Sequence, residues 1–200
     1  MYKSPSKEQL DTLIQYYKTN DYKNAEKLAI ILTKDFPDNE LPWKILSITQ
    51  KKLGKISDSL IAIQKIIEIN PKNYLAHYNL GNSYKELGNF YAAKKSYKKA
   101  ISLNPKFLEA QYNLAIVSKE NGNLEESILS YEKAISIDPN FIEAYNNLGN
   151  IYDNLGQLDN AEKYYTKVIS LNPSFAEAYN NLGNINEKKG KINKAKIKYE

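Results

Sequence analysis

The chain has no cysteine and no arginine, and only one histidine among its 200 residues. Without cysteine it can form neither a disulfide framework nor a thiolate metal site. One histidine cannot supply a histidine-based metal cluster. No stretch approaches the ~18 apolar residues of a membrane span, and no apolar run typical of a secretory signal follows the start. We therefore expect no cofactor, no metal and no membrane partner, and a protein of a reducing, cytoplasmic compartment.

The basic charge comes from one residue type. All 28 basic residues are lysines, set against 23 acidic residues, which gives a net charge of +5. Base and phosphate recognition leans on the planar guanidinium fork of arginine, which this chain lacks. Abundant Lys, Asn, Ile and Tyr are typical of an AT-rich genome, and this explains the charge more simply than a nucleic-acid partner does. We expect no nucleic-acid binding, which stays the minority alternative.

Two kinds of residue recur every 34 positions. The prolines of this series are Pro37, Pro71, Pro105, Pro139 and Pro173, and the glycines are Gly54, Gly88, Gly122, Gly156 and Gly190. Two such series in phase over five cycles indicate a solenoid, in which each repeat packs on its neighbours. A function is then expected on a repeated surface and not in a single pocket.

Residues 40–73 show how one unit is expected to fold. Apolar residues spaced three and four apart, such as Leu46 in the first half and Ile63 in the second, predict two helices. Gly54 between them can take the left-handed conformation that ends a helix. Pro71 ends the second helix because its ring forces the preceding residue out of helical torsions. The pattern predicts an all-α fold of antiparallel helix pairs.

Small and large residues also keep the repeat. The first helices carry a small residue after the repeated leucine, and the second helices carry a small residue followed four positions later by tyrosine. The three sets are Ser47, Gly81, Ala115, Gly149 and Gly183; Ala93, Ser127, Ala161 and Ala195; and Tyr97, Tyr131, Tyr165 and Tyr199. Large side chains that face small ones let two helices interlock at high packing density. We expect these positions to form the core.

One unit displays the whole pattern: Tyr145-x2-Leu148-Gly149-x2-Tyr152, Ala161-x3-Tyr165 and Pro173. This resembles the tetratricopeptide repeat, whose pattern is W-x2-L-G-x2-Y, A-x3-F and P at a period of 34. The resemblance covers residues 6–200. It implies a right-handed superhelical solenoid whose concave groove binds an extended peptide or partner segment.

The resemblance divides the chain into a lead-in, residues 1–5, and a repeat region, residues 6–200. The repeats are 6–39, 40–73, 74–107, 108–141, 142–175 and an incomplete 176–200. The first departs from the pattern as a capping unit should: Thr12 and Leu13 replace leucine and the small residue, and Asn20 replaces glycine.

The last repeat is expected to place a second helix from about Ile192 to Glu200. That helix stops before the proline that closes every earlier unit. We therefore expect the chain to be a fragment of a longer protein, with an open end that exchanges backbone amides fastest and allows self-association.

A row of asparagines along the first helices is the candidate binding site. Its members are Asn79, Asn82, Asn113, Asn147, Asn150, Asn181 and Asn184, and Ile116 interrupts it. An amide offers a donor and an acceptor, which match the N–H and C=O groups of an extended peptide. The row therefore predicts solvent-facing amides that grip peptide backbone. Copying of a surface asparagine by duplication is the alternative explanation.

The row also resembles the asparagine ladder of O-linked N-acetylglucosamine transferases and SPINDLY-like proteins, which holds polypeptide substrates. That resemblance extends to Asn79, Asn113, Asn147 and Asn181. Two functions follow as hypotheses: a protein-interaction module, or the substrate-recruiting arm of a larger transferase with its catalytic domain beyond residue 200. We expect no enzymatic activity within these residues, and we expect His77 to be a packed ring at the site of Trp43.

Overall fold

The structure is a computed structural model that describes residues 4–197, with side chains described for residues 4–191. It has two compact units, unit 1 up to Ala110 and unit 2 from Gln111. The described residues form helices joined by short turns and contain no strand, which confirms the predicted all-α class.

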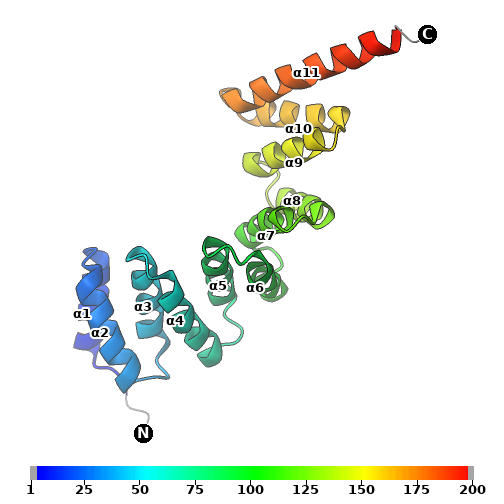
Figure 1. The fold of residues 1–200 in the computed structure, drawn as a ribbon. Helices are drawn as coiled ribbons and strands as arrows, with labels where there is room; N and C mark the ends of the chain where they lie inside the picture. The colour runs from blue at the N-terminus through cyan, green and yellow to red at the C-terminus, as the bar shows by residue number, and fades with distance from the viewer. Residues whose placement is uncertain (1–3, 198–200) are drawn as a thin grey trace. The chain divides into compact units, whose positions relative to one another are not determined.

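Unit 1 holds three helix pairs (Figure 1). They are α1 (Lys7–Lys18) and α2 (Tyr22–Asp35), α3 (Glu40–Lys52) and α4 (Ile56–Ile69), and α5 (Tyr74–Glu86) and α6 (Phe90–Leu103). Each helix contacts the next in the chain, and α1 also contacts α3. We call the odd-numbered helices the first helices and the even-numbered ones the second helices.

Helix α7 (Leu108–Glu120) runs across the boundary between the units. Unit 2 continues with α8 (Leu124–Ile137), α9 (Ile142–Asn154), α10 (Leu158–Leu171) and α11 (Ala176–Ile197). Here α8 contacts α9, α9 contacts α10, and α10 contacts α11.

Glycine ends the first helices as predicted. Gly54, Gly88, Gly122 and Gly156 have φ between 69° and 76°. After α3, the Gly54 N–H donates to the Lys51 carbonyl and the Lys55 N–H to the Gln50 carbonyl, a pairing that satisfies the last carbonyls of the helix. Asn20 takes the same left-handed conformation, with φ 60°, which confirms that asparagine replaces glycine in the first unit.

The prediction for the final repeat is wrong at one point. Helix α11 is continuous from Ala176 to Ile197, so Gly190 does not end it and no separate second helix begins at Ile192. Continuing the helix retains the main-chain hydrogen bonds that a turn would break, while a glycine inside a helix costs only about 1 kcal/mol. Lys189 precedes Gly190, and its Nζ lies 2.6 Å from a carboxylate oxygen of Asp159 in α10. Before three of the earlier glycines the equivalent residue is leucine. The predicted last residues, 198–200, lie outside the described part.

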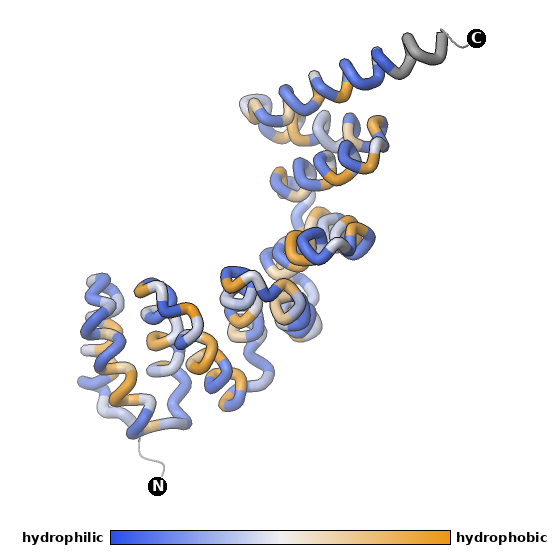
Figure 2. The backbone as a smooth tube through the Cα atoms, viewed as in Figure 1, coloured by the Kyte–Doolittle hydropathy of each residue, from blue (hydrophilic) through white to orange (hydrophobic). Residues whose placement is uncertain are grey.

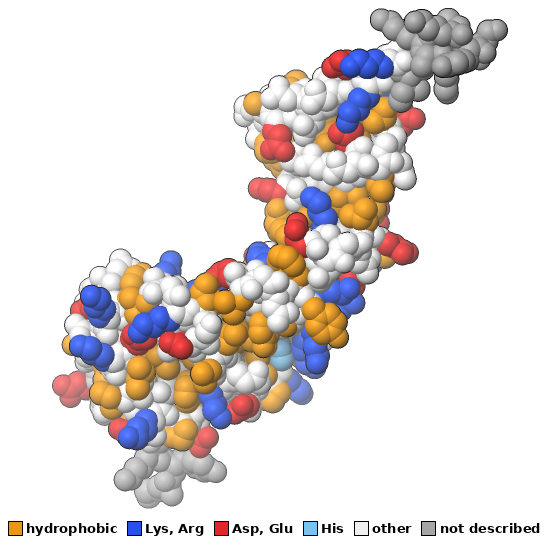
Figure 3. All heavy atoms as spheres, viewed as in Figure 1, with side chains coloured by type: hydrophobic (Ala, Val, Ile, Leu, Met, Phe, Trp, Pro, Cys, Tyr) orange, Lys and Arg blue, Asp and Glu red, His pale blue; other side chains and the backbone are white. Residues whose placement is uncertain are grey.

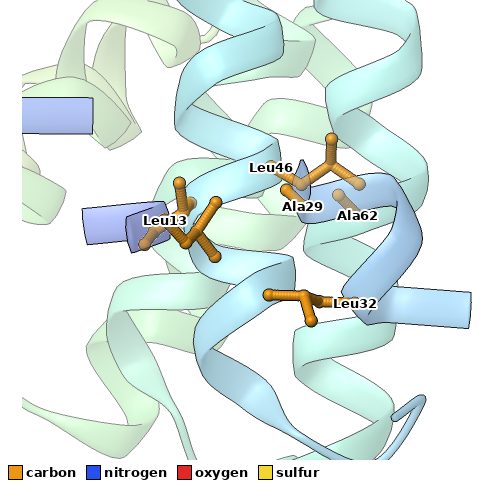
Figure 4. Close-up of a cluster of buried hydrophobic side chains, with 6 residues drawn as sticks. Leu13, Ala29, Leu32, Leu46 and Ala62 are labelled. Carbon is orange, nitrogen blue, oxygen red and sulfur yellow. The ribbon is translucent and has the colours of Figure 1, made fainter. Parts of the chain in front are cut away.

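An apolar cluster joins the first two helix pairs of unit 1. Leu13, Ala29, Leu32, Leu46 and Ala62 pack together from α1, α2, α3 and α4 (Figure 4). Hydrophobic and hydrophilic residues alternate along these helices, as the colours of Figure 2 show. The buried stripe thus follows the three-and-four spacing read from the sequence.

Large and small residues interlock where predicted. A Cβ atom added to Gly81 would lie 2.5 Å from Tyr97 Cε1, and one added to Gly149 would lie 2.5 Å from Tyr165 Cε1. Both rings are fully buried. Only glycine therefore leaves room for the tyrosine ring in these two pairs, whereas an added Cβ at Gly183 meets nothing within 4 Å among the described atoms.

Candidate peptide-binding surface

The asparagine row lies on the first helices but is not uniformly open. In unit 2, Asn147, Asn150 and Asn181 are half-buried, Asn184 is exposed, and Asn113 is buried at 8% exposure. The expected solvent-facing row therefore does not include Asn113. Its side chain packs into the structure because α7 is enclosed along most of its length.

Asn150 is held by two hydrogen bonds. The Tyr165 hydroxyl donates to Asn150 Oδ1 at 2.7 Å, and Asn181 Nδ2 donates to the same oxygen at 3.2 Å. The oxygen of Asn150 is therefore occupied, and its amide nitrogen keeps two donor hydrogens. Burial raises the pKa of Tyr165 to about 12, so its hydroxyl stays a donor throughout the neutral range.

Unit 1 repeats this pair. The Tyr97 hydroxyl donates to Asn82 Oδ1 at 2.7 Å, and burial raises the pKa of Tyr97 well above its ordinary value. Asn82 is half-buried. In both units the second asparagine of a first helix thus also serves the fold, because it accepts the hydroxyl of the buried tyrosine.

Near the interruption at Ile116, the asparagine of the next repeat contacts a tyrosine of α7. Ile116 cannot accept a hydroxyl, and the contact made here is of another kind: Asn147 Nδ2 of α9 donates to the Tyr112 hydroxyl at 3.2 Å. Burial raises the pKa of both Tyr112 and Tyr131, and hydrogen bonding from Asn147 opposes that rise at each. Asn147 therefore links two successive first helices.

Asn79 lies in a groove of unit 1. The groove has a volume of about 460 Å³ and is lined by α3, α4 and α5, with Ser47, Lys51, Asn79 and Glu86 on its walls. Lys51 Nζ lies 2.6 Å from a Glu86 carboxylate oxygen, which puts an ion pair on the wall. Asn79 itself is exposed and lines this groove.

Sequence reasoning missed Asn146. It is only 7% exposed, and its Nδ2 donates to Glu177 Oε1 of α11 at 3.0 Å. Its Oδ1 has no hydrogen-bond partner within the described structure. The position carries Tyr78 and Tyr112 in earlier repeats, so the repeat pattern gave no signal for it.

His77 is a packed ring, as predicted. It is 9% exposed, and its Nε2 lies 3.0 Å from the Pro71 carbonyl oxygen. Trp43 makes the equivalent contact, since its Nε1 donates to the Pro37 carbonyl at 2.8 Å. A carbonyl only accepts, so the His77 proton sits on Nε2. Within the described residues no group of three or more His, Cys, Asp or Glu side chains is placed to hold a metal, and no helix is long and apolar enough to cross a membrane.

Comparison with known families agrees with this geometry. One tetratricopeptide-repeat model matches residues 74–107 and 142–175. A second, described as a TPR repeat, matches residues 117–156, and a third tetratricopeptide-repeat model matches residues 96–128 and 164–197. The chain carries tetratricopeptide repeats. No curated protein sequence matched it.

Solved structures of other repeat proteins share the fold. A crystal structure of MamA is 28% identical, with a TM-score of 0.77 over 82% of this chain and 95% of that one. MamA from Desulfovibrio magneticus RS-1 is 18% identical, with a TM-score of 0.79 over 88% and 99% of the two chains. YrrB, described as a TPR protein with an unusual peptide-binding site, is 16% identical with a TM-score of 0.77 over 88% and 91%. The last two likenesses concern the fold alone.

Proposed function

We propose that this tetratricopeptide-repeat chain is a protein-interaction module that binds an extended polypeptide along its first helices, through the amides of the asparagine row. The observation that carries the proposal is the hydrogen-bonded arrangement of Asn147, Asn150 and Asn181 in unit 2. These hydrogen bonds within the protein decide whether the oxygen or the N–H groups of each amide remain for a ligand.

The amide groups that remain for a ligand alternate between hydrogen-bond donors and acceptors. Asn150 keeps its two N–H donors, because both contacts are made to its oxygen. Asn147 donates through its amide nitrogen and keeps its carbonyl oxygen, while Asn181 uses one N–H hydrogen and keeps its carbonyl oxygen and a second N–H. An extended peptide also presents C=O and N–H groups in alternation. Amides fixed by the fold lose little side-chain entropy on binding, which favours affinity.

These contacts are made to the backbone of the bound peptide, so its affinity should depend only weakly on its sequence. The predicted row then has two kinds of member. Asn79 and Asn184 are exposed and serve binding alone, while Asn82 and Asn150 also accept a tyrosine hydroxyl. Asn113, which is buried, would contribute only through its neighbours.

Fluorescence anisotropy with a labelled pool of uncharged 15-residue peptides tests the proposal. The double change Asn147→Ala with Asn181→Ala should weaken binding at least tenfold. Asn160→Ala is the matched control, because Asn160 is an exposed asparagine on a second helix of the same unit and should leave binding unchanged. Equal affinities for the double variant and the control would refute the proposal, provided that thermal melts show both variants folded.

A further inference from the structure

A second groove lies in unit 1 among α4, α5 and α6, away from the groove that holds Asn79. It has a volume of about 730 Å³. Ile67 and Leu80 give it an apolar floor, His77 adds a buried ring, and Tyr91 at its edge is 78% exposed. Lysine side chains of α6 form one wall, and Figure 3 shows the pale blue histidine beside blue lysines on this face.

Helix α6 is unusual in charge. It carries Lys94, Lys95, Lys98 and Lys99 and no acidic residue. The second helices on either side are not basic in this way: α4 contains Asp58 and Glu68, and α8 contains three glutamates against one lysine. Lys95, Lys98 and Lys99 all line the groove. Three like charges within about one helical turn repel each other mildly, so they favour an anionic partner.

A counterpart of this groove lies in unit 2, where its lysines already contact tyrosine rings. There it has about 570 Å³, and its lining residues Ile135, Tyr145, Lys163 and Lys167 stand 68 positions after Ile67, His77, Lys95 and Lys99. Both of those lysines lie over tyrosine rings: Lys163 Nζ is 5.8 Å from the Tyr164 ring centre, and Lys167 Nζ is 5.9 Å from that of Tyr145. Such cation–π contacts occupy the charge within the protein.

Three substitutions account for the difference between the grooves. Tyr164, stacked on Tyr152 with ring centres 5.4 Å apart, stands where unit 1 has Ser96. Ser96 also lines its groove but is much smaller than tyrosine, and its hydroxyl donates to the Ala92 carbonyl at 2.9 Å. Thr166 and Glu132 stand where unit 1 has Lys98 and Gln64. The unit 1 groove is therefore larger and more positive.

We propose that the unit 1 groove, which we call the outer groove, binds an acidic polypeptide segment. Its carboxylates pair with Lys95, Lys98 and Lys99, and an apolar side chain two residues further along the segment, on the same face of the strand, lies on Ile67. Carboxylates two residues apart on an extended strand are about 7 Å apart, close to the spacing of lysines three or four apart on a helix. A nucleic acid would match the lysines but leave the apolar floor uncovered. The outer groove is formed by other residues than the asparagine row, so the protein would hold two partner segments.

The test uses the whole chain and a labelled 12-residue peptide made of two Glu-Ser-Glu-Ser-Leu-Ser repeats, which puts glutamates and leucine on one face of an extended strand. Anisotropy titrations compare it with the same peptide carrying glutamine for glutamate, and with a 12-nucleotide oligothymidylate. The acidic peptide should bind at least tenfold more tightly than the glutamine peptide. Oligothymidylate binding equal to that of the acidic peptide would overturn the assignment to polypeptide.

Variants exchange the two grooves. Lys98→Thr should weaken acidic-peptide binding several-fold, and adding Ser96→Tyr should weaken it more than tenfold, because both changes install the residues of unit 2. The reverse double change in unit 2, Thr166→Lys with Tyr164→Ser, installs the residues of unit 1. It should create a second site for the acidic peptide. Unchanged affinity in the folded Lys98→Thr variant would refute the proposal. The Asn147→Ala, Asn181→Ala variant should bind the acidic peptide normally, which separates this test from that of the asparagine row.

Discussion

The two units build the same helix pairs around different buried side chains. From α3 onward, one position of the first helices, repeated every 34 residues, is Thr49 and Ser83 in unit 1 but Val117, Ile151 and Ile185 in unit 2. All five side chains are 0–1% exposed. The hydroxyls of Thr49 and Ser83 have no hydrogen-bond partner in the described structure. The fold thus tolerates a polar atom at this position, at a cost in stability that unit 2 avoids.

The units agree where tyrosine meets glycine, and this gives the largest expected effect. Gly81→Ala and Gly149→Ala place a Cβ atom 2.5 Å from a fully buried ring, so each should destabilise the protein by about 1–3 kcal/mol. Gly183→Ala meets no described atom and should stabilise α11 by about 1 kcal/mol through helix propensity. Denaturant unfolding measures all three.

The Gly183 variant also checks the continuous helix α11. If the chain instead turned at Gly190, Tyr199 would pack on Gly183 as Tyr165 packs on Gly149. A loss of stability in Gly183→Ala as large as that in Gly149→Ala would therefore contradict the continuous helix.

Alkaline pH should weaken both units through their buried tyrosines. Burial raises the pKa of Tyr97 in unit 1 and of Tyr131 and Tyr165 in unit 2 above the ordinary value of 10.0. The folded state therefore holds these protons more tightly than the unfolded state. Their contribution is complete below pH 10 and is lost as the pH rises from 10 toward 12, by roughly 2 kcal/mol for Tyr165 alone.

Unfolding monitored by circular dichroism from pH 9 to pH 12 measures this loss, alongside tyrosinate absorbance. Tyr165→Phe should show a shallower decline above pH 10, although it starts from a lower stability because Asn150 loses a donor. An unfolding free energy that stays constant to pH 12 would show that the phenols ionise freely in the folded state.

A matched exchange at the buried position tests the difference between the units. Thr49→Val removes an unpaired buried hydroxyl at nearly constant volume and should stabilise the chain by about 1 kcal/mol. Val117→Thr introduces one in unit 2 and should destabilise it by about 1–2 kcal/mol. Thermal and urea unfolding compare them. Effects of the same sign would mean that the hydroxyl finds a partner in one of the two sites.

The smallest effect separates the two kinds of asparagine. Asn82→Ala and Asn150→Ala each leave a buried tyrosine hydroxyl without its acceptor and should cost about 1 kcal/mol in either unit. Asn184→Ala changes an exposed side chain and should stay within about 0.5 kcal/mol. Indistinguishable urea midpoints for all three variants would show that the phenol contacts contribute nothing to stability.

The sequence predicted the helix pairs because the signals that set them are local. A glycine or asparagine that adopts positive φ, and a proline that excludes a helix before it, act through their own backbone and need no distant partner. The interlocking of Tyr165 with Gly149 was also predictable, since it follows from the repeat itself. Gly190 shows the limit: the same residue ends a helix only when the following segment packs back on the preceding one.

The functional surfaces depended on tertiary structure. Which amide of the row remains available is decided by tyrosine hydroxyls that lie 15 residues away in sequence, as for Asn150 and Tyr165. The outer groove joins residues of three helices, and its counterpart in unit 2 is lined by Tyr164 in place of Ser96. By itself the sequence determined the repeat, its helix pairs and its buried stripe, since torsions and periodicity are properties of neighbouring residues. Only the folded chain decided which polar groups are already paired, because hydrogen bonding and packing join residues that the sequence keeps apart.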